Sequence, residues 1–228
     1  MIFLQTVAAT AAQTNADMSG ELSTNLLSLS MKGGWVMAIL VVLSILSVYI
    51  FIERYIVISR NSKEDKNLMN MIRDHIYSGK LQTAKELCER QNTPIARMIE
   101  KGLMRIGKPL NDVHAAIENV GNLEIARLEK NIAVLATVAS TAPMLGFLGT
   151  VIGMIVAFYD MSMAGNNIDI QLLSSGIYQA MVTTVGGLIV GILAYVMHNI
   201  LVARIDKLVF LLEARASEFM DLLNEPAA

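Results

Sequence analysis

Three threonine hydroxyls stand inside two long uncharged runs of the chain. Thr150 belongs to APMLGFLGTVIGMIVA at 142–157, and Thr183 and Thr184 belong to GIYQAMVTTVGGLIVGI at 176–192. Polar groups are expensive inside a membrane, so hydroxyls in such runs are candidate ion-path residues that can donate and accept hydrogen bonds. The alternative for Thr150 is that its hydroxyl donates to a carbonyl one turn back and the side chain only packs.

Small residues surround these hydroxyls at helical spacing. The first run carries Ala136, Ala139, Pro143, Gly146, Thr150, Gly153 and Ala157, and the second carries Gly176, Ala180, Thr184, Gly187, Gly191 and Ala194. In a membrane, small side chains three or four residues apart let helix backbones approach closely. The two stripes therefore predict two helices that share an interface. Neither stripe contains Asp, Glu, Lys or Arg, so a partner must supply the titratable group if protons move here.

Composition sets the class of protein. The 228 residues are 54% hydrophobic and 17% charged, with a mean hydropathy of +0.51, which is too apolar for an ordinary soluble domain of this size. The predicted fold class is all-α: an integral membrane protein with three transmembrane helices, two of them extended into a cytoplasmic helical bundle. The formal net charge of −2 offers no basic excess for nucleic acid.

The sequence carries no pattern for catalysis or for a cofactor. It has no nucleophile–base pair, phosphate loop or cluster of metal ligands, and the single cysteine, Cys88, excludes an intrachain disulfide framework. His75 and His114 stand apart from other ligand types, so surface or packing roles are expected for them. We therefore predict that the protein is not an enzyme and has no catalytic residue, cofactor or metal site.

Uncharged runs and the placement of basic residues predict the topology. Each of the three longest apolar runs can cross a hydrocarbon core of about 30 Å at about 1.5 Å per residue. Of the 18 Lys and Arg, only Lys32 precedes the first run and none lies between the second and third. The positive-inside rule then places the N-terminus outside and the C-terminus in the cytoplasm.

This topology divides the chain into segments. They are an outer N-terminal segment at 1–32 with an amphipathic helix at 21–31, a transmembrane helix at 33–53, a cytoplasmic helical domain at 54–131, a transmembrane helix at 132–159, an outer loop at 160–171, a transmembrane helix at 172–203 and a cytoplasmic C-terminal helix at 204–228. Within 54–131 the helical patterns break at Gly79, at 92–94 and at 107–109. Thr93 before Pro94 predicts an N-cap, and Asn111 with Asp112 predicts a further helix start. Whether residues 1–16 are cleaved is left open.

The two apolar runs together resemble the paired signature of the MotA/TolQ/ExbB proton channel family. The three-span order with a large cytoplasmic segment after the first span is similar to the ExbB branch, the biopolymer transport proteins. The resemblance implies a multi-pass protein of a cell inner membrane with a periplasmic N-terminus. It also implies a homopentamer around a pair of single-span ExbD-type subunits. Such a motor uses proton-motive force to act on a TonB-like protein and energise TonB-dependent transport across the outer membrane.

The resemblance also assigns residues. Thr150 matches the threonine of the family's GTV motif and Thr184 that of the third helix, both facing the pore, with Thr183 beside them on the proton path. The partner-facing stripe comprises Pro143, Gly146, Gly153, Gln179, Ala180 and Gly187. The proton-binding aspartate belongs to the ExbD-type partner. Family members usually carry a glutamate where this chain has Gln179, which cannot titrate, so either that glutamate is no obligatory relay or the coupling here is altered.

Other functions stay open at this point. A TolQ-like role in envelope maintenance, a gliding-type motility motor and a structural membrane scaffold each fit part of the pattern, whereas a solute channel acting alone fits three spans with isolated threonines poorly. The transported substrate and the choice between proton and sodium are equally open. A Thr150→Val substitution separates a scaffold, which should tolerate it, from a proton path, which should not.

Overall fold

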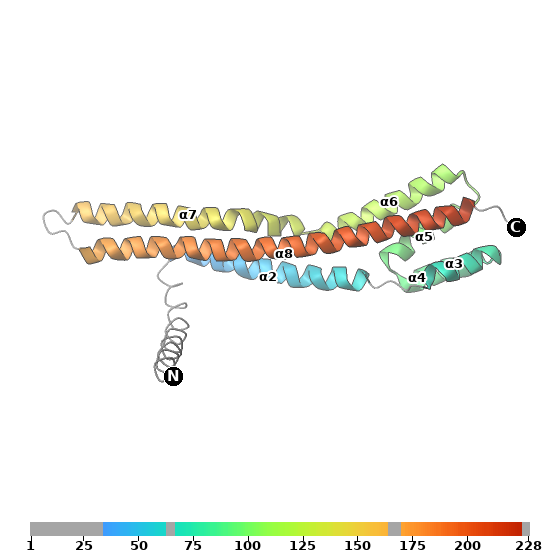
Figure 1. Ribbon diagram of the computed structural model, residues 1–228, viewed down its shortest axis with the longest axis horizontal. Coiled ribbons are helices and arrows are strands. Elements are labelled where there is room, and N and C mark those ends of the chain that lie inside the picture. The colour runs from blue at the N-terminus through green and yellow to red at the C-terminus, as the bar shows by residue number, and fades with distance from the viewer. Residues whose placement is uncertain (1–33, 63–66, 164–169, 225–228) are drawn as a thin grey trace, which may run out of the picture. The chain divides into compact units, whose positions relative to one another are not determined.

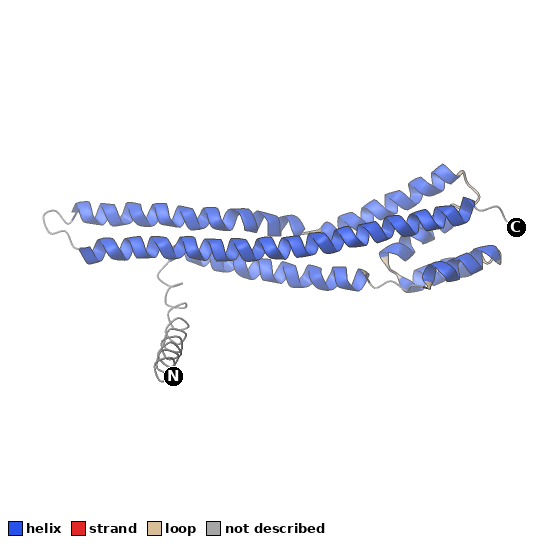
Figure 2. Cartoon of the chain, in the orientation of Figure 1, coloured by secondary structure: helices blue, strands red, loops and turns tan. Residues whose placement is uncertain are grey.

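The computed structural model describes residues 34–62, 67–163 and 170–224. Over these ranges the chain is all-α and holds no strand (Figure 2), which confirms the predicted fold class. The helices are α2 (Gly34–Asn61), α3 (Leu68–Tyr77), α4 (Leu81–Gln91), α5 (Pro94–Leu103), α6 (Leu110–Glu129), α7 (Ile132–Met163) and α8 (Ile170–Asn224). The predictions for 1–16 and 21–31 lie outside the described residues.

Within the described residues, three helical stretches are long and apolar enough to cross a membrane, as predicted. They are Gly34–Asn61, Leu110–Met163 and Leu173–Asn224. Many of their large apolar side chains lie on the surface of the single chain, such as Val42 and Ile155, each more than 60% exposed. Such exposure suits helices whose outer faces meet lipid or neighbouring membrane helices rather than water.

The described chain divides into two compact units. The membrane unit takes α2 up to Ser47 together with the part of α7 and α8 between Thr137 and Tyr195. Its core is a cluster of small and branched side chains contributed by all three helices, namely Val36, Leu40, Val138, Ala142 and Ala194. Within this unit α7 and α8 run side by side and antiparallel (Figure 1).

The second unit holds the rest of α2, all of α3 to α6, the start of α7 and α8 from Val196 onward. It is called here the soluble unit only because it contains most of the segment predicted to be a cytoplasmic domain. Its main cluster joins α3, α4, α5 and α6 to the end of α8, where Phe219 is completely buried. A second cluster gathers apolar residues of α2, α6, α7 and α8, with Leu135 and Leu201 fully buried.

The predicted helix breaks of the soluble unit are present, with one shift. Thr93 accepts a hydrogen bond from the Ala96 N–H at 3.2 Å, and Pro94 occupies the first position of α5, so the predicted N-cap is confirmed. However, α6 begins at Leu110, one residue before the predicted Asn111. Pro109 supplies the extended backbone before the helix. Asp112 lies in the first turn, where the positive end of the helix dipole stabilises a carboxylate.

The junction between α6 and α7 is a short break. Asn131 adopts a left-handed φ of 65° between the two helices. The guanidinium of Arg54, on α2, donates to the Arg127 carbonyl at 3.4 Å, one of the last-turn carbonyls that have no partner within α6. By contrast α8 has no break, so the predicted tail from Arg204 onward is a direct continuation of the third apolar helix.

Candidate functional site

The two small-residue stripes face each other inside one chain. A Cβ added at Gly187 would lie 2.6 Å from the Ala142 carbonyl oxygen and 2.8 Å from the Gly146 Cα. A Cβ added at Gly146 would lie 2.9 Å from the Thr183 carbonyl oxygen. No real side chain tolerates such distances, so the backbones of α7 and α8 are in direct contact here and only glycine fits.

The same contact continues toward both ends of the interface. A Cβ at Gly191 would meet the Pro143 ring at 2.6 Å, and one at Gly153 would meet the Ala180 Cβ at 3.0 Å. Pro143 lies within α7 and has no N–H to donate to the Ala139 carbonyl one turn back. The ring therefore sits against a glycine, where the other helix leaves room for it.

The candidate hydroxyls all donate to backbone carbonyls. Thr150 donates to the Phe147 carbonyl of its own helix. Thr183 donates to the Ala180 carbonyl at 2.7 Å. Thr184 donates across the interface to the Gly146 carbonyl at 3.2 Å. With their protons committed in this way, the hydroxyl oxygens are left as acceptors for an incoming donor.

The three threonines differ in the solvent exposure of their side chains. Thr183 is buried, at 2% exposure, and its hydroxyl also lies 3.5 Å from the Gly146 carbonyl oxygen. Thr150 and Thr184 are half-buried in the single chain. Since Thr183 and Thr184 both point at one carbonyl, neither donates to the other in this arrangement. A donor group from outside the chain would therefore have better access to Thr150 and Thr184 than to Thr183.

The structure brings together five of the six stripe residues named from the sequence. Pro143, Gly146, Gly153, Ala180 and Gly187 all contact the opposite helix of the same chain. Their facing a second subunit stays a prediction. The sixth, Gln179, is exposed, and its Nε2 lies 3.1 Å from where a Cβ of Gly34 would be. Gln179 thus borders the start of α2.

Gly149 is a member of the interface that sequence reasoning missed. A Cβ there would lie 2.5 Å from the Thr183 hydroxyl oxygen, so this glycine makes room for the buried threonine. The signal was available, because Gly146, Gly149 and Gly153 also follow a spacing of three and four residues along a helix.

The soluble unit contains a buried ion-pair cluster that the sequence did not reveal. The Glu124 side chain is 5% exposed. It accepts hydrogen bonds from the Arg97 Nε at 3.0 Å and from an Arg127 nitrogen at 2.7 Å. The Arg97 guanidinium also donates a hydrogen bond to the Asn92 carbonyl at 2.8 Å. The cluster ties α5 to α6 and belongs to the architecture of this unit.

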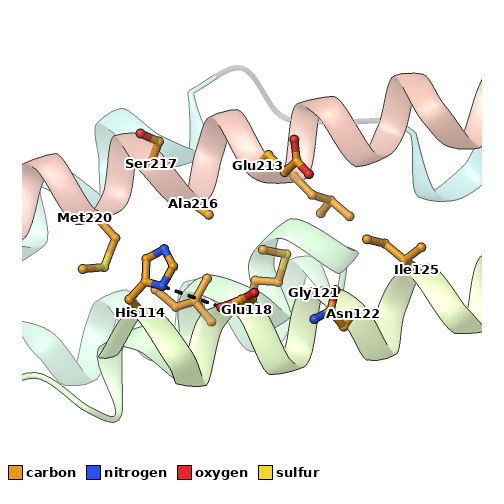
Figure 3. A pocket seen from close by; sticks show the side chains of 12 residues that line it. His114, Glu118, Gly121, Asn122, Ile125, Glu213, Ala216, Ser217 and Met220 are labelled. Carbon is orange, nitrogen blue, oxygen red and sulfur yellow. Dashed lines mark ion pairs between the residues drawn. The ribbon is translucent and has the colours of Figure 1, made fainter. Parts of the chain in front are cut away.

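A cavity of about 350 Å³ opens between α6 and the last part of α8 (Figure 3). Its floor is apolar, and Glu118 and Glu213 lie on opposite helices at its rim. His114 lies one turn before Glu118, with 3.8 Å between ring nitrogen and carboxylate, and both side chains are more than 60% exposed. Among the described residues no three His, Cys, Asp or Glu side chains gather as metal ligands.

Cys88 is buried in the core of the soluble unit. Burial, with smaller contributions from the negative charges of Glu100 and Glu89, raises the pKa of its thiol from 9.0 to about 12. Since the thiolate is the reactive form, this cysteine is a core residue rather than a nucleophile.

These features define a helical membrane protein built around a backbone-packed pair of apolar helices with isolated hydroxyls. The chain belongs to the MotA/TolQ/ExbB proton channel family, whose model matches residues 90–214. The matched range contains the whole α7–α8 interface, and the match confirms the family predicted from the two apolar runs.

Individual relatives support the same family assignment. The ExbB homolog of Methanothermobacter thermautotrophicus is 33% identical over 128 residues, which cover 56% of this chain and 44% of that protein. The ExbB-like protein 1 of Synechocystis sp. is 30% identical over 176 residues, 76% of this chain and 69% of that protein. The Tol-Pal system protein TolQ of Haemophilus influenzae is 39% identical over 85 residues, 37% of each chain. The chain thus spans less than half of the archaeal relative.

Proposed function

We propose that the chain is the channel-lining subunit of a proton-driven motor in a cell inner membrane. In this proposal an ExbD-type single-span subunit pair lies inside a homopentamer of the chain and carries the carboxylate that binds the proton. The N-terminus is periplasmic, and the soluble unit with the C-terminal part of α8 is cytoplasmic. The position of 17 of the 18 basic residues after the first apolar run supports this orientation.

One observation carries the proposal: Thr150 and Thr184 are half-buried hydroxyls on a helix pair whose stripes hold no ionisable residue. Both hydroxyls donate to carbonyls, so their oxygens can accept a hydrogen bond from a protonated carboxyl group on a partner helix. When that carboxyl group loses its proton, it can only accept hydrogen bonds. It then has no proton to donate to the threonine oxygens, and the hydrogen bond is lost. The helix pair thereby distinguishes the two protonation states of its partner.

The work performed by the motor is proposed from the relatives. Two of those reported above carry the ExbB name, which supports a role in energising TonB-dependent transport across an outer membrane through a TonB-like protein. The second candidate is a TolQ-like role in envelope maintenance, and the H. influenzae TolQ match over 85 residues favours it. Both candidates use the same helix pair and differ in the protein that the motor moves.

The first experiment identifies the partners. The tagged chain is purified from its native membrane in mild detergent, and co-purifying proteins are identified by mass spectrometry while light scattering gives the number of copies. We expect five copies with a small single-span protein that has an aspartate near the start of its span. A TonB-like companion would select the transport branch and Tol proteins the other. Recovery of a stable monomer or dimer alone would contradict the motor.

The second experiment tests the hydroxyls. Thr150→Val and Thr184→Val keep the side-chain shape and remove the hydroxyl, whereas Thr150→Ser and Thr184→Ser are matched controls that keep it. We expect the valine variants to assemble normally but to lose energised uptake, and the serine variants to retain most of it. Normal uptake in both valine variants would refute the pore assignment and favour a scaffold.

A further inference from the structure

The membrane unit contains a cavity of about 170 Å³ at the end where α2 begins and α7 finishes. Its polar side chains are Asp160 from α7 and Ser175, Gln179 and Thr183 from α8. A volume of this size has room for several water molecules, and four polar side chains give those waters partners. The cavity is therefore a mainly apolar space between the helices of a single chain, in which a few polar side chains can hold water.

Among the described residues, a single side chain gives this cavity a formal charge. Asp160 is the ionisable group among the described residues that line it, and no Lys, Arg or His lines it. The first turns of α2 and α8 contribute partial positive charges and the last turn of α7 a partial negative charge, each about half an elementary charge, so their sum is smaller than the full charge of a carboxylate. The Asp160 carboxylate thus decides that the cavity attracts cations and repels anions.

The cavity reaches inward to one of the three candidate hydroxyls. Thr183 lines it, and the next residue, Thr184, donates to the Gly146 carbonyl in the α7–α8 contact. Gln179 forms part of the wall and lies against Gly34 at the start of α2. One continuous space thereby joins the helix ends to the buried threonine.

We infer that this cavity is the entry vestibule for the hydrated cation that drives the motor. Asp160 concentrates the cation at the mouth, and the neutral Gln179 lets it pass toward Thr183. In this arrangement Asp160, on the other helix, supplies the negative charge that Gln179 lacks. The inference rests on the proposed function, since it names the route by which the ion reaches that same helix pair.

Charge-selective labelling tests the vestibule. Ser175→Cys is introduced into the full-length chain in its native membrane, and its reaction with a cationic trimethylammonium-ethyl methanethiosulfonate is compared with that of an anionic sulfonatoethyl methanethiosulfonate. Each rate is divided by the rate of the same reagent with a free thiol in solution. We expect the cation to be favoured about tenfold, the order for unit charges several ångströms apart in water-like surroundings. The parent chain serves as the blank, because its Cys88 is buried.

Two variants identify the source of the preference. Asp160→Asn in the Ser175→Cys chain should reduce the ratio to about one, whereas Asp221→Asn, near the far end of α8, should leave it unchanged. Equal rates in the presence of Asp160, or no labelling at all, would overturn the vestibule. The labelling does not require a running motor, so it can succeed while the threonine variants refute the proposed function, and the reverse.

Discussion

Replacing Gly187 by alanine should separate α7 from α8 and weaken the folded protein. The new Cβ would lie 2.6 Å from the Ala142 carbonyl oxygen, whereas ordinary contacts begin at 3.4 Å, so the backbones must move apart by about 0.8 Å. The hydrogen bond from Thr184 to the Gly146 carbonyl then lengthens from 3.2 Å to about 4.0 Å, beyond hydrogen-bonding distance.

The magnitude follows from these two losses. Overpacking a well-packed site costs about 1–3 kcal/mol, and an interhelical hydrogen bond in a membrane contributes about 0.6 kcal/mol. We therefore expect the free energy of unfolding to fall by about 1.6–3.6 kcal/mol relative to a matched glycine-to-alanine change that meets no backbone.

The adjacent glycine supplies that control. A Cβ at Gly186 would meet side-chain atoms only, namely the end of the flexible Met37 side chain at 3.1 Å and the Leu40 Cδ1 at 3.9 Å. Both substitutions gain the same helix propensity, so their difference isolates the backbone contact. The assay is reversible unfolding in mixed micelles titrated with sodium dodecyl sulfate. If Gly187→Ala and Gly186→Ala were equally stable, the close approach of α7 and α8 would be refuted.

Two further predictions concern the soluble unit. Glu124→Ala should lower the free energy of unfolding by about 2–3 kcal/mol, because it leaves Arg97 without its buried partner, while Arg127→Ala should cost less than about 1 kcal/mol, because that side chain is 69% exposed. Thermal melting of the two variants checks this, and equal losses would contradict it. The raised pKa of Cys88, about 12 against 9.0, means that the folded state holds the thiol proton more tightly than the unfolded state. The contribution of this thiol to stability is complete below pH 9 and is lost between pH 9 and about pH 12. Because the thiol is buried and protonated in the folded state, maleimide labelling at pH 8 should be slow until the protein is unfolded. Fast labelling of the folded chain would argue against burial.

Local patterns predicted the parts of the fold that depend on neighbouring residues. The three apolar helices follow from uncharged length alone, and the start of α5 follows from Thr93 and Pro94. The small-residue stripes predicted a shared interface because their spacing is that of one helix face. Their register was not predictable, since sliding one helix by a turn also places small residues opposite one another.

Contacts between distant residues escaped prediction for a different reason. The buried positions of α6 are Val113, Ile117, Gly121, Glu124 and Leu128, so apolar periodicity does place Glu124 on the inner face. Its partner Arg97 is 27 residues away, and no local pattern links the two. Likewise Asp160 belongs to a predicted loop in the sequence, and only the folded helices bring it to the same cavity as Gln179.

The backbone contact between Gly146 and Gly187 has a consequence for genetics. At most helix interfaces, a substitution that adds bulk can be compensated by a second substitution to a smaller residue on the facing helix. Here the opposite surface is already glycine and peptide group, with nothing left to trim. Intragenic suppressors of Gly187→Ala should therefore arise outside the facing positions of α7, in residues that change how far apart the two helices lie.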